Sequence, residues 1–195
     1  VLEDALFSLH KQKINLTGSG RTDSGVHAFR QAANFFSPID SIPVEKYPLA
    51  LNSFLPEDVR IMEAQIVPDD FSSRYSATSR VYRYFINTKS PFASQMRFCW
   101  PIYRTPNLEK LNKMASLLKG EMDCASFAAS GDQSVSTNRY IECARFFYEN
   151  ENLVFEIEAN AFLWKMVRTV VGTIIHFEQT GKDEFYLKKV IESKN

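Results

Sequence analysis

The sequence predicts an α+β fold. Segments with the spacing of amphipathic helices and segments with the alternating pattern of strands occur in both halves of the chain. Two strand-like segments, 140–147 and 153–159, flank the short polar stretch Glu149–Asn152, which favours an antiparallel hairpin. Helices mixed with antiparallel strands are typical of α+β proteins.

The first half of the chain is predicted to contain two helices and two strands. Apolar residues recur at helical spacing over residues 1–9 and 44–54, and Pro48 is tolerated because it falls near the first turn of the second helix. Residues 26–36 are predicted to form a strand after a glycine-rich turn. Residues 59–67 are predicted to form another, because apolar and polar side chains alternate along them.

A polar, proline-containing stretch, residues 68–73, is a plausible linker. We therefore expect two domains, residues 1–70 and residues 71–195. In the second domain, Asn107 is a candidate N-cap for a helix over residues 108–119.

Residues 80–87 form the clearest predicted strand of the second domain. The pleat of a strand places Tyr82 and Tyr84 on the same face. Two tyrosines in this arrangement pack in a core with their hydroxyls at its edge, or they provide a surface on which a base stacks. The residues alone leave both interpretations open.

The strongest helical pattern covers residues 162–177. Its polar exceptions, Lys165, Arg168, Gly172 and His176, recur at steps of three or four and form one narrow stripe. Burying a guanidinium costs roughly several kcal/mol unless an acid pairs with it. Arg168 therefore either pairs with a carboxylate or phosphate, or extends from the edge of the stripe into solvent.

The amino-acid composition is that of an ordinary globular protein and excludes few functions. The chain has 195 residues, of which 45% are hydrophobic and 24% charged, as is usual for globular proteins. Its 23 basic and 23 acidic residues give a net charge of zero, which argues mildly against a nucleic-acid partner unless the basic residues gather on one face. The 16 Phe and 8 Tyr fit either a large core or stacking on bases.

The three cysteines, Cys99, Cys124 and Cys143, are widely spaced and contain no CxxC pair. They predict buried thiols rather than a zinc site or a disulfide framework. No apolar run is long enough to span a membrane, and no signal-peptide pattern begins the chain. We therefore expect a cytoplasmic protein without a membrane partner.

A glycine-rich turn, residues 18–28, holds a single carboxylate, Asp23. Gly18, Gly20 and Gly25 allow the backbone to bend on both sides of it. An acid in such a turn is a nucleophile, an element of an anion site, or only a turn former. The choice among these decides the function.

Two neighbours of Asp23 also allow more than one interpretation. Arg21 is a solvated turn residue, or it contacts phosphate or fills the gap left by an extruded base. His27 is more simply a packing or hydrogen-bonding residue than a base, and the other histidines lack metal-ligand spacing with it, so no metal is expected. A pair between Asp23 and Arg168 would satisfy both groups, because the arginine would keep a shielded carboxylate ionised.

The stretch Gly20–Ala28, Gly-Arg-Thr-Asp-Ser-Gly-Val-His-Ala, resembles the signature of the TruA-type tRNA pseudouridine synthases. The resemblance continues in register along nearly the whole chain. The further matching motifs are Ala50-Leu51-Asn52, Leu55-Pro56, Phe71-x-x-Arg74, Arg80-x-Tyr82-x-Tyr84, Gly120-Glu121, Arg139, Ile157-x-Ala159-Asn160-x-Phe162, Met166-Val167-Arg168 and Val171-Gly172.

This resemblance implies the pseudouridine synthase fold, with two related halves that are each an antiparallel sheet covered by helices and with the active cleft between them. It implies conversion of uridine to pseudouridine in the anticodon stem-loop of tRNA, at uridines 38–40. It also implies a homodimer that needs neither a metal nor an organic cofactor.

The resemblance assigns roles by position. Asp23 matches the essential aspartate, Tyr82 the tyrosine that stacks on the base, and Arg168 the arginine that pairs with the aspartate. Four further residues are implied to contact RNA, and they are Arg21, Thr22, His27 and Arg80.

The sequence departs from the family pattern at a few places. Ser24 replaces the usual Ala, and Trp164 and Lys165 replace residues that are often His or Tyr. The first and last strands of the pattern do not occur between Val1 and Asn195, so we expect the chain to lack both ends of the pattern. Two other functions remain open: a tRNA-binding protein without catalysis, and a glycoside hydrolase, which would need a second acid near Asp23.

Overall fold

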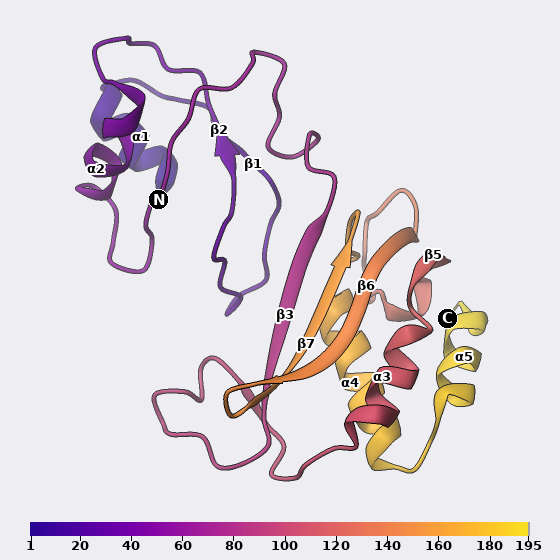
Figure 1. Cartoon of the computed structure of the whole chain (residues 1–195). Coiled ribbons are helices and arrows are strands. Elements are labelled where there is room, and N and C mark those ends of the chain that lie inside the picture. The colour runs from indigo at the N-terminus through magenta and orange to yellow at the C-terminus, as the bar shows by residue number, and fades with distance from the viewer. Residues whose placement is uncertain (195) are drawn as a thin grey trace. The chain divides into compact units, whose positions relative to one another are not determined.

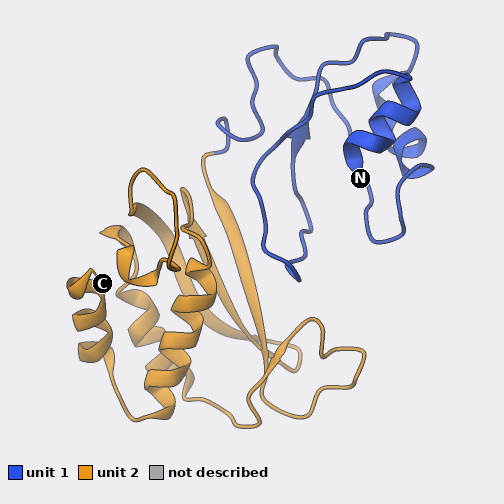
Figure 2. Ribbon diagram, turned by 180° about the vertical axis from the view of Figure 1, so that it is seen from behind, with its two compact units in different colours: residues 1–77 blue, residues 78–195 orange. Residues whose placement is uncertain are grey.

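The computed structural model describes residues 1–194 of the chain. The chain divides into two compact units, Val1–Ala77 (unit 1) and Thr78–Asn195 (unit 2), which Figure 2 shows in different colours. Both units contain helices and antiparallel strands, so the α+β prediction is confirmed. Each unit has its own buried apolar cluster.

Unit 1 is built around two helices. Helix α1 spans Leu2–His10, and the 3₁₀ turn η1 (Val44–Lys46) leads into α2 (Tyr47–Asn52). Both predicted helices are therefore present, although the second is shorter than predicted and ends before Phe54. The core of unit 1 consists of six buried residues among those described: Ala5, Leu6, Ile14, Tyr47, Leu51 and Leu55.

The strand predicted over residues 26–36 is wrong for most of its length. Strand β2 spans only Ala33–Asn34, and it pairs antiparallel with β1, Thr17–Gly18 (Figure 1). The residues before β2 belong to a long loop that the pair closes at its base. The pattern of residues 26–36 thus predicted a strand over all of them, but only Ala33 and Asn34 have a strand partner.

The strand predicted over residues 59–67 is also wrong, since none of these residues, all of which are described, lies in a strand. Val59 and Ile61 do pack on the core of unit 1, which explains the alternating pattern. The main chain of Ile61 bonds to a side chain instead of a strand: its N–H donates to Asn52 Oδ1 at 2.8 Å, and its carbonyl accepts from Asn52 Nδ2 at 2.9 Å. Asn52 thus takes the place of a neighbouring strand.

Unit 2 contains a five-stranded sheet in the order β4-β3-β7-β6-β5. Its strands are β3 (Arg80–Asn87), β4 (Trp100–Pro101), β5 (Gly120–Asp123), β6 (Asn138–Glu149) and β7 (Asn152–Ala159). All neighbouring pairs are antiparallel except β3 and β4. The predicted strand 80–87 and the predicted hairpin are confirmed, and Asn150 turns the hairpin with a φ of 53°.

Helices cover one face of this sheet. They are α3 (Leu108–Ser116), α4 (Met166–Gln179) and α5 (Glu184–Ser193), which Figure 1 shows gathered on one side of the strands. The core between them and the sheet contains 21 buried residues among those described, so unit 2 has by far the larger apolar interior. Asn107 caps α3 as predicted, accepting a hydrogen bond from the Lys110 N–H at 3.0 Å.

Two helix predictions in unit 2 need correction. The helix predicted over residues 162–177 begins only at Met166, because Lys165 adopts the left-handed conformation with a φ of 59°. Helix α5 was not predicted at all. Its signal is present in the sequence, because Asp183 caps it and Leu187 is its buried residue.

The opposite face of the sheet carries a row of charged residues on three neighbouring strands. Glu156 of β7 is buried and lies between Arg83 of β3 and Arg145 of β6. The Glu156 carboxylate accepts from Arg83 Nε at 2.8 Å and from Arg145 Nη2 at 2.6 Å. Burial alone would raise the pKa of Glu156, but the bonds from Arg145 and Arg83 hold it below its usual value.

The cysteines are free thiols in unit 2: Cys99, Cys124 and Cys143. Only Cys124 is fully buried, and this burial raises its pKa to about 11. The prediction of three buried thiols is therefore right for Cys124 and wrong for the two partly exposed ones. Within residues 1–194, no helix has the length and apolar character that crossing a bilayer requires.

Candidate functional site

Asp23 lies in the long loop that joins β1 to β2 in unit 1. Two hydrogen bonds close the base of this loop beyond the strand pair: the Ser19 N–H donates to the Ala32 carbonyl at 2.9 Å, and Gln31 Nε2 donates to the Gly20 carbonyl at 2.7 Å. The loop is therefore a tethered structure although few of its residues lie in strands.

Asp23 begins a tight turn. The Val26 N–H donates to the Asp23 carbonyl at 3.1 Å, and Gly25 has a φ of 79°. This left-handed conformation at the third position of a four-residue turn favours glycine, because a side chain would be strained there. The Asp23 main chain forms the turn, while its side chain is partly exposed. The prediction that Asp23 forms a turn is thus correct for its main chain. The hydrogen bond from the Val26 N–H is accepted by the main chain and assigns no role to the carboxylate.

The base of the loop is anchored by contacts that the sequence analysis missed. Asn34 of β2 accepts from the Ser73 N–H at 2.9 Å through Oδ1, and Ser73 Oγ donates to the Thr17 carbonyl at 2.7 Å. Ser73 is only 2% exposed. Asn34 interrupts the apolar stretch 32–36, and this polar residue within it was the available signal for such an anchor.

The other predicted residues of unit 1 surround Asp23 along the same loop. Arg21, Thr22 and His27 are exposed. The expectation that His27 begins a strand is wrong, because β2 starts six residues later. The loop therefore presents a partly exposed carboxylate among exposed polar and cationic side chains.

Tyr82 of β3 faces the helices of unit 2. Its ring meets Phe162 edge to face, with 4.9 Å between ring centroids and an angle of 80° between ring planes. Tyr82 is partly buried and packs against the core of unit 2. The packing interpretation is therefore correct, although the residue is only partly buried.

Arg80 opens the same strand. Its Nη1 donates to the Asn160 carbonyl at 2.8 Å, and Asn160 follows the end of β7. Asn160 also pairs with β6, because its Oδ1 accepts from the Tyr140 N–H at 3.0 Å. Arg80 is thus held at the end of the sheet where β3 and β6 begin and β7 ends.

Arg168 lies in the first turn of α4, and α4 packs against β3. Arg168 and His176 are exposed, whereas Val170 and Val171 are buried. The polar stripe predicted for this helix is therefore confirmed as its exposed side. Arg168 therefore lies outside the core of unit 2.

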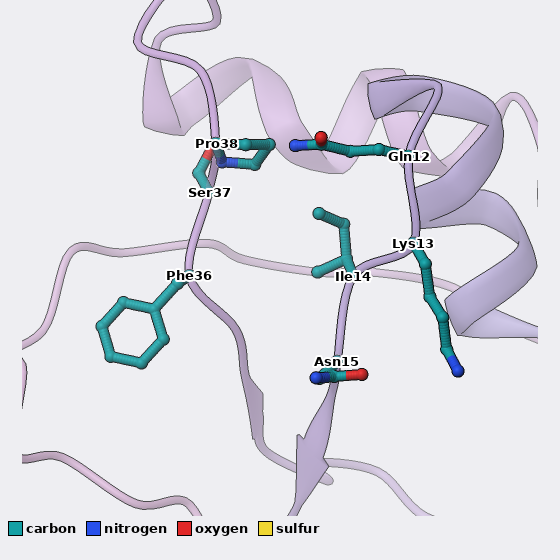
Figure 3. Close-up of a pocket in the computed structure, with 7 residues that line it drawn as sticks. All are labelled: Gln12, Lys13, Ile14, Asn15, Phe36, Ser37 and Pro38. Atoms are coloured by element: carbon teal, nitrogen blue, oxygen red, sulfur yellow. The ribbon is translucent and has the colours of Figure 1, made fainter.

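Two further features bear on ligand chemistry. Among residues 1–194, no group of three or more His, Cys, Asp or Glu side chains is placed to hold a metal ion. A pocket of about 320 Å³ in unit 1 lies between residues 12–15 and 36–38 (Figure 3). Figure 3 shows Gln12 directed towards Pro38 across this opening, with the Ile14 side chain below them in the view. None of the predicted site residues lines this pocket.

The sequence of this chain is similar to those of known proteins. The tRNA pseudouridine synthase family model matches residues 1–76 and 114–195. The tRNA pseudouridine synthase A of Treponema denticola is 52% identical over 194 residues, which are 99% of this chain and 72% of that protein. Those of Treponema pallidum (strain Nichols) and Thermoanaerobacter sp. are 46% and 39% identical, over 91% and 100% of this chain.

The chain therefore belongs to the tRNA pseudouridine synthase family, a class of isomerases. Its relatives named tRNA pseudouridine synthase A place it within the TruA type. The chain spans 64% of the length of the Treponema pallidum relative and 80% of that of the Thermoanaerobacter relative.

Proposed function

We propose that this chain carries the catalytic residues of an enzyme that isomerises uridine to pseudouridine in the anticodon stem-loop of tRNA. Asp23 is its essential carboxylate. The observation that carries the proposal is the tethered turn of unit 1, which presents Asp23 beside Arg21 in a chain of this family.

The reaction needs little more than a positioned acid and a closed site. The uridine leaves the stacked stem at a cost of roughly a few kcal/mol. The bond between N1 and C1′ breaks, the uracil rotates, and a bond forms between C5 and C1′. The hydrogen of C5 is released to solvent and N1 gains a proton, so atoms and electrons balance without a redox cofactor.

In this proposal, Asp23 acts on the sugar or base as an ionised carboxylate. Arg168 pairs with it and keeps it charged when water is excluded, which also fixes its orientation. This role suits the position of Arg168 on the exposed side of α4. The arginine projects from the surface of unit 2 and is not buried in its core.

Tyr82 stacks on the extruded uracil in this proposal. Its edge-to-face contact with Phe162 holds the ring in place, and the incomplete burial of Tyr82 is compatible with stacking on a base. Arg21 fills the gap left in the stem or contacts phosphate, and Thr22, His27 and Arg80 contact the RNA. The domains of residues 1–70 and 71–195 then supply the carboxylate and the stacking platform, respectively.

The decisive test replaces Asp23 by Asn. We expect tritium release from tRNA labelled at uridine C5 to fall by at least about 10³-fold, while tRNA affinity changes by less than about threefold, because the amide keeps the shape but not the charge. Asp40→Asn is the control, since Asp40 is an exposed acid of unit 1 that lies outside the loop between β1 and β2. Full turnover by the Asp23 variant would contradict the proposal, and wild-type protein that binds tRNA without releasing tritium would indicate a non-catalytic binding protein.

The proposed role of Arg168 predicts a smaller effect. Arg168→Gln should lower kcat by about 10²-fold, the usual cost of removing one charge-stabilising donor from an active site. His176→Gln is the control on the same exposed stripe of α4 and should change kcat by less than about twofold. Equal losses in both variants would remove Arg168 from the mechanism.

We further propose that the substrate is the anticodon stem-loop, at uridines 38–40, and that the enzyme is a cytoplasmic homodimer. Tritium release from tRNAs in which single uridines of this stem-loop are replaced by cytidine identifies the modified positions. Sedimentation equilibrium of the protein gives its oligomeric state. Undiminished release from a tRNA lacking all uridines of the stem-loop would contradict the proposed target.

A further inference from the structure

Asp132 holds the chain segment that connects β7 to α4. Its Oδ2 accepts a hydrogen bond from the Trp164 N–H at 2.5 Å, and its Oδ1 accepts from the Ser134 N–H at 2.8 Å. The Ala129 N–H donates to the Trp164 carbonyl at 3.0 Å. Both main-chain polar groups of Trp164 are therefore bonded to the turn formed by residues 129–132.

This turn is itself compact. The Asp132 N–H donates to the Ala129 carbonyl at 3.1 Å, and Gly131 has a φ of 90°. A Cβ atom at Gly131 would lie 3.7 Å from Cζ3 of Trp164, so the indole lies close over the turn. The hydrogen bond from the Trp164 N–H holds the pKa of Asp132 below its usual value.

The connecting segment depends on such bonds for its order. Leu163 and Met166 are buried, but the two residues between them are exposed. Lys165 also adopts a left-handed conformation, which costs roughly 1–2 kcal/mol for a residue with a side chain. The contacts from residues 129–132 oppose this cost and fix where α4 begins.

Two residues of the proposed site lie close to this segment on either side. Phe162, which supports the ring of Tyr82, precedes Trp164 by two positions, and Arg168 follows it by four. A shift of the Trp164 main chain would therefore move both the support of the stacking tyrosine and the first turn of α4. A displacement of about 1 Å in a catalytic group lowers a rate by roughly 10²-fold.

We propose that Asp132 is a positioning residue for pseudouridine formation, which acts through the Trp164 main chain on Phe162 and Arg168. This role rests on the proposed function. It requires no contact between Asp132 and RNA. It accounts for a carboxylate that bonds to main-chain N–H groups of two separate segments.

The test compares Asp132→Ala with Asp123→Ala. Asp123 is a matched control in the same unit, because its carboxylate also accepts from a main-chain N–H, that of Ala125, and from Thr137 Oγ1, but not from Trp164. Asp132→Ala should lower kcat for tritium release by about 10- to 100-fold with KM changed by less than about threefold, whereas Asp123→Ala should leave kcat within about twofold. Asp132→Asn keeps an acceptor oxygen and should recover most of the rate.

Amide hydrogen exchange measures the hydrogen bond between the Trp164 N–H and Asp132 independently of activity. Exchange at the Trp164 N–H should accelerate at least about tenfold in Asp132→Ala and not in Asp123→Ala. Unchanged kcat despite faster exchange, or equal kcat losses in both variants, would overturn the positioning role. If wild-type protein releases no tritium, the proposed function fails together with this role, while the exchange result still tests the bond itself.

Discussion

The two units of this protein reach order by different means. Unit 2 encloses 21 buried apolar residues between a five-stranded sheet and its helices, in the part of the chain that the structure describes. Unit 1 has six such residues, and its strands β1 and β2 contain two residues each. Side chains bonded to main chain, those of Gln31, Asn34, Asn52 and Ser73, hold the extended segments of unit 1 in place.

This difference indicates how the proposed roles are divided. Burial of apolar surface makes a rigid platform, which suits a ring that must stack on a base and a helix that must present an arginine. A loop tied by a few polar contacts is less constrained, which suits a turn that must admit an RNA strand. Both tryptophans, Trp100 and Trp164, belong to unit 2, so their fluorescence separates the two units experimentally.

The largest expected effect is in the core of unit 2. Phe155 of β7 is fully buried and lies 4.6 Å from Phe146 between ring centroids. Phe155→Ala should reduce the free energy of unfolding of unit 2 by about 3–5 kcal/mol, because it leaves a cavity in a packed interior. Urea unfolding followed by tryptophan fluorescence measures this loss. Val135→Ala, at a fully exposed position, is the control and should change stability by less than about 0.5 kcal/mol.

A smaller effect is expected when the side chain that replaces a strand in unit 1 is removed. Asn52→Ala deletes both hydrogen bonds to Ile61 and should destabilise unit 1 by about 1–3 kcal/mol. Hydrogen exchange of peptides from residues 1–77 measures this, and the tryptophan signal of unit 2 should stay unchanged. Asn15→Ala, at an exposed position, serves as the control. A loss as small as that of the control would show that burial alone holds residues 59–67.

The smallest expected effect is a difference in acid sensitivity. His10 is 9% exposed, packs against Phe35 and Tyr47, and has no hydrogen-bond partner for either ring nitrogen among residues 1–194. Burial lowers its pKa below the ordinary 6.5. The unfolded chain therefore binds a proton first, and unit 1 should lose stability as the pH falls below 6.5.

Unit 2 should respond only at lower pH. The lowered pKa of Glu156 means that its contribution is fully present above the ordinary 4.5 and is lost as the pH falls through the folded value. Hydrogen exchange at pH 7 and at about pH 5.5 should therefore show faster opening in residues 1–77 alone. His10→Phe should abolish this pH dependence, and its persistence in that variant would assign the effect to another group.

The parts of the candidate site that depend on residues close together in the chain could be predicted from the sequence. Gly25 after Asp23 predicted a turn, and the structure places a left-handed residue there. The alternation over residues 80–87 predicted that Tyr82 and Tyr84 share a face, and in the structure both pack against the core of unit 2. Asp132 was not found, because its bond to Trp164 joins residues 32 positions apart and nothing near either residue indicates the other.

The sequence by itself predicted α1 to α4 and the main extended segments, but not α5, because the spacing of apolar residues depends on neighbours three or four residues away at most. Only the tertiary structure decided which extended segments become strands. Residues 80–87 pair with a neighbouring strand along their whole length, while the main chain of Ile61 is hydrogen-bonded to the side chain of Asn52. The reason is physical: an extended main chain needs donors and acceptors beside it, and distant parts of the chain supply them.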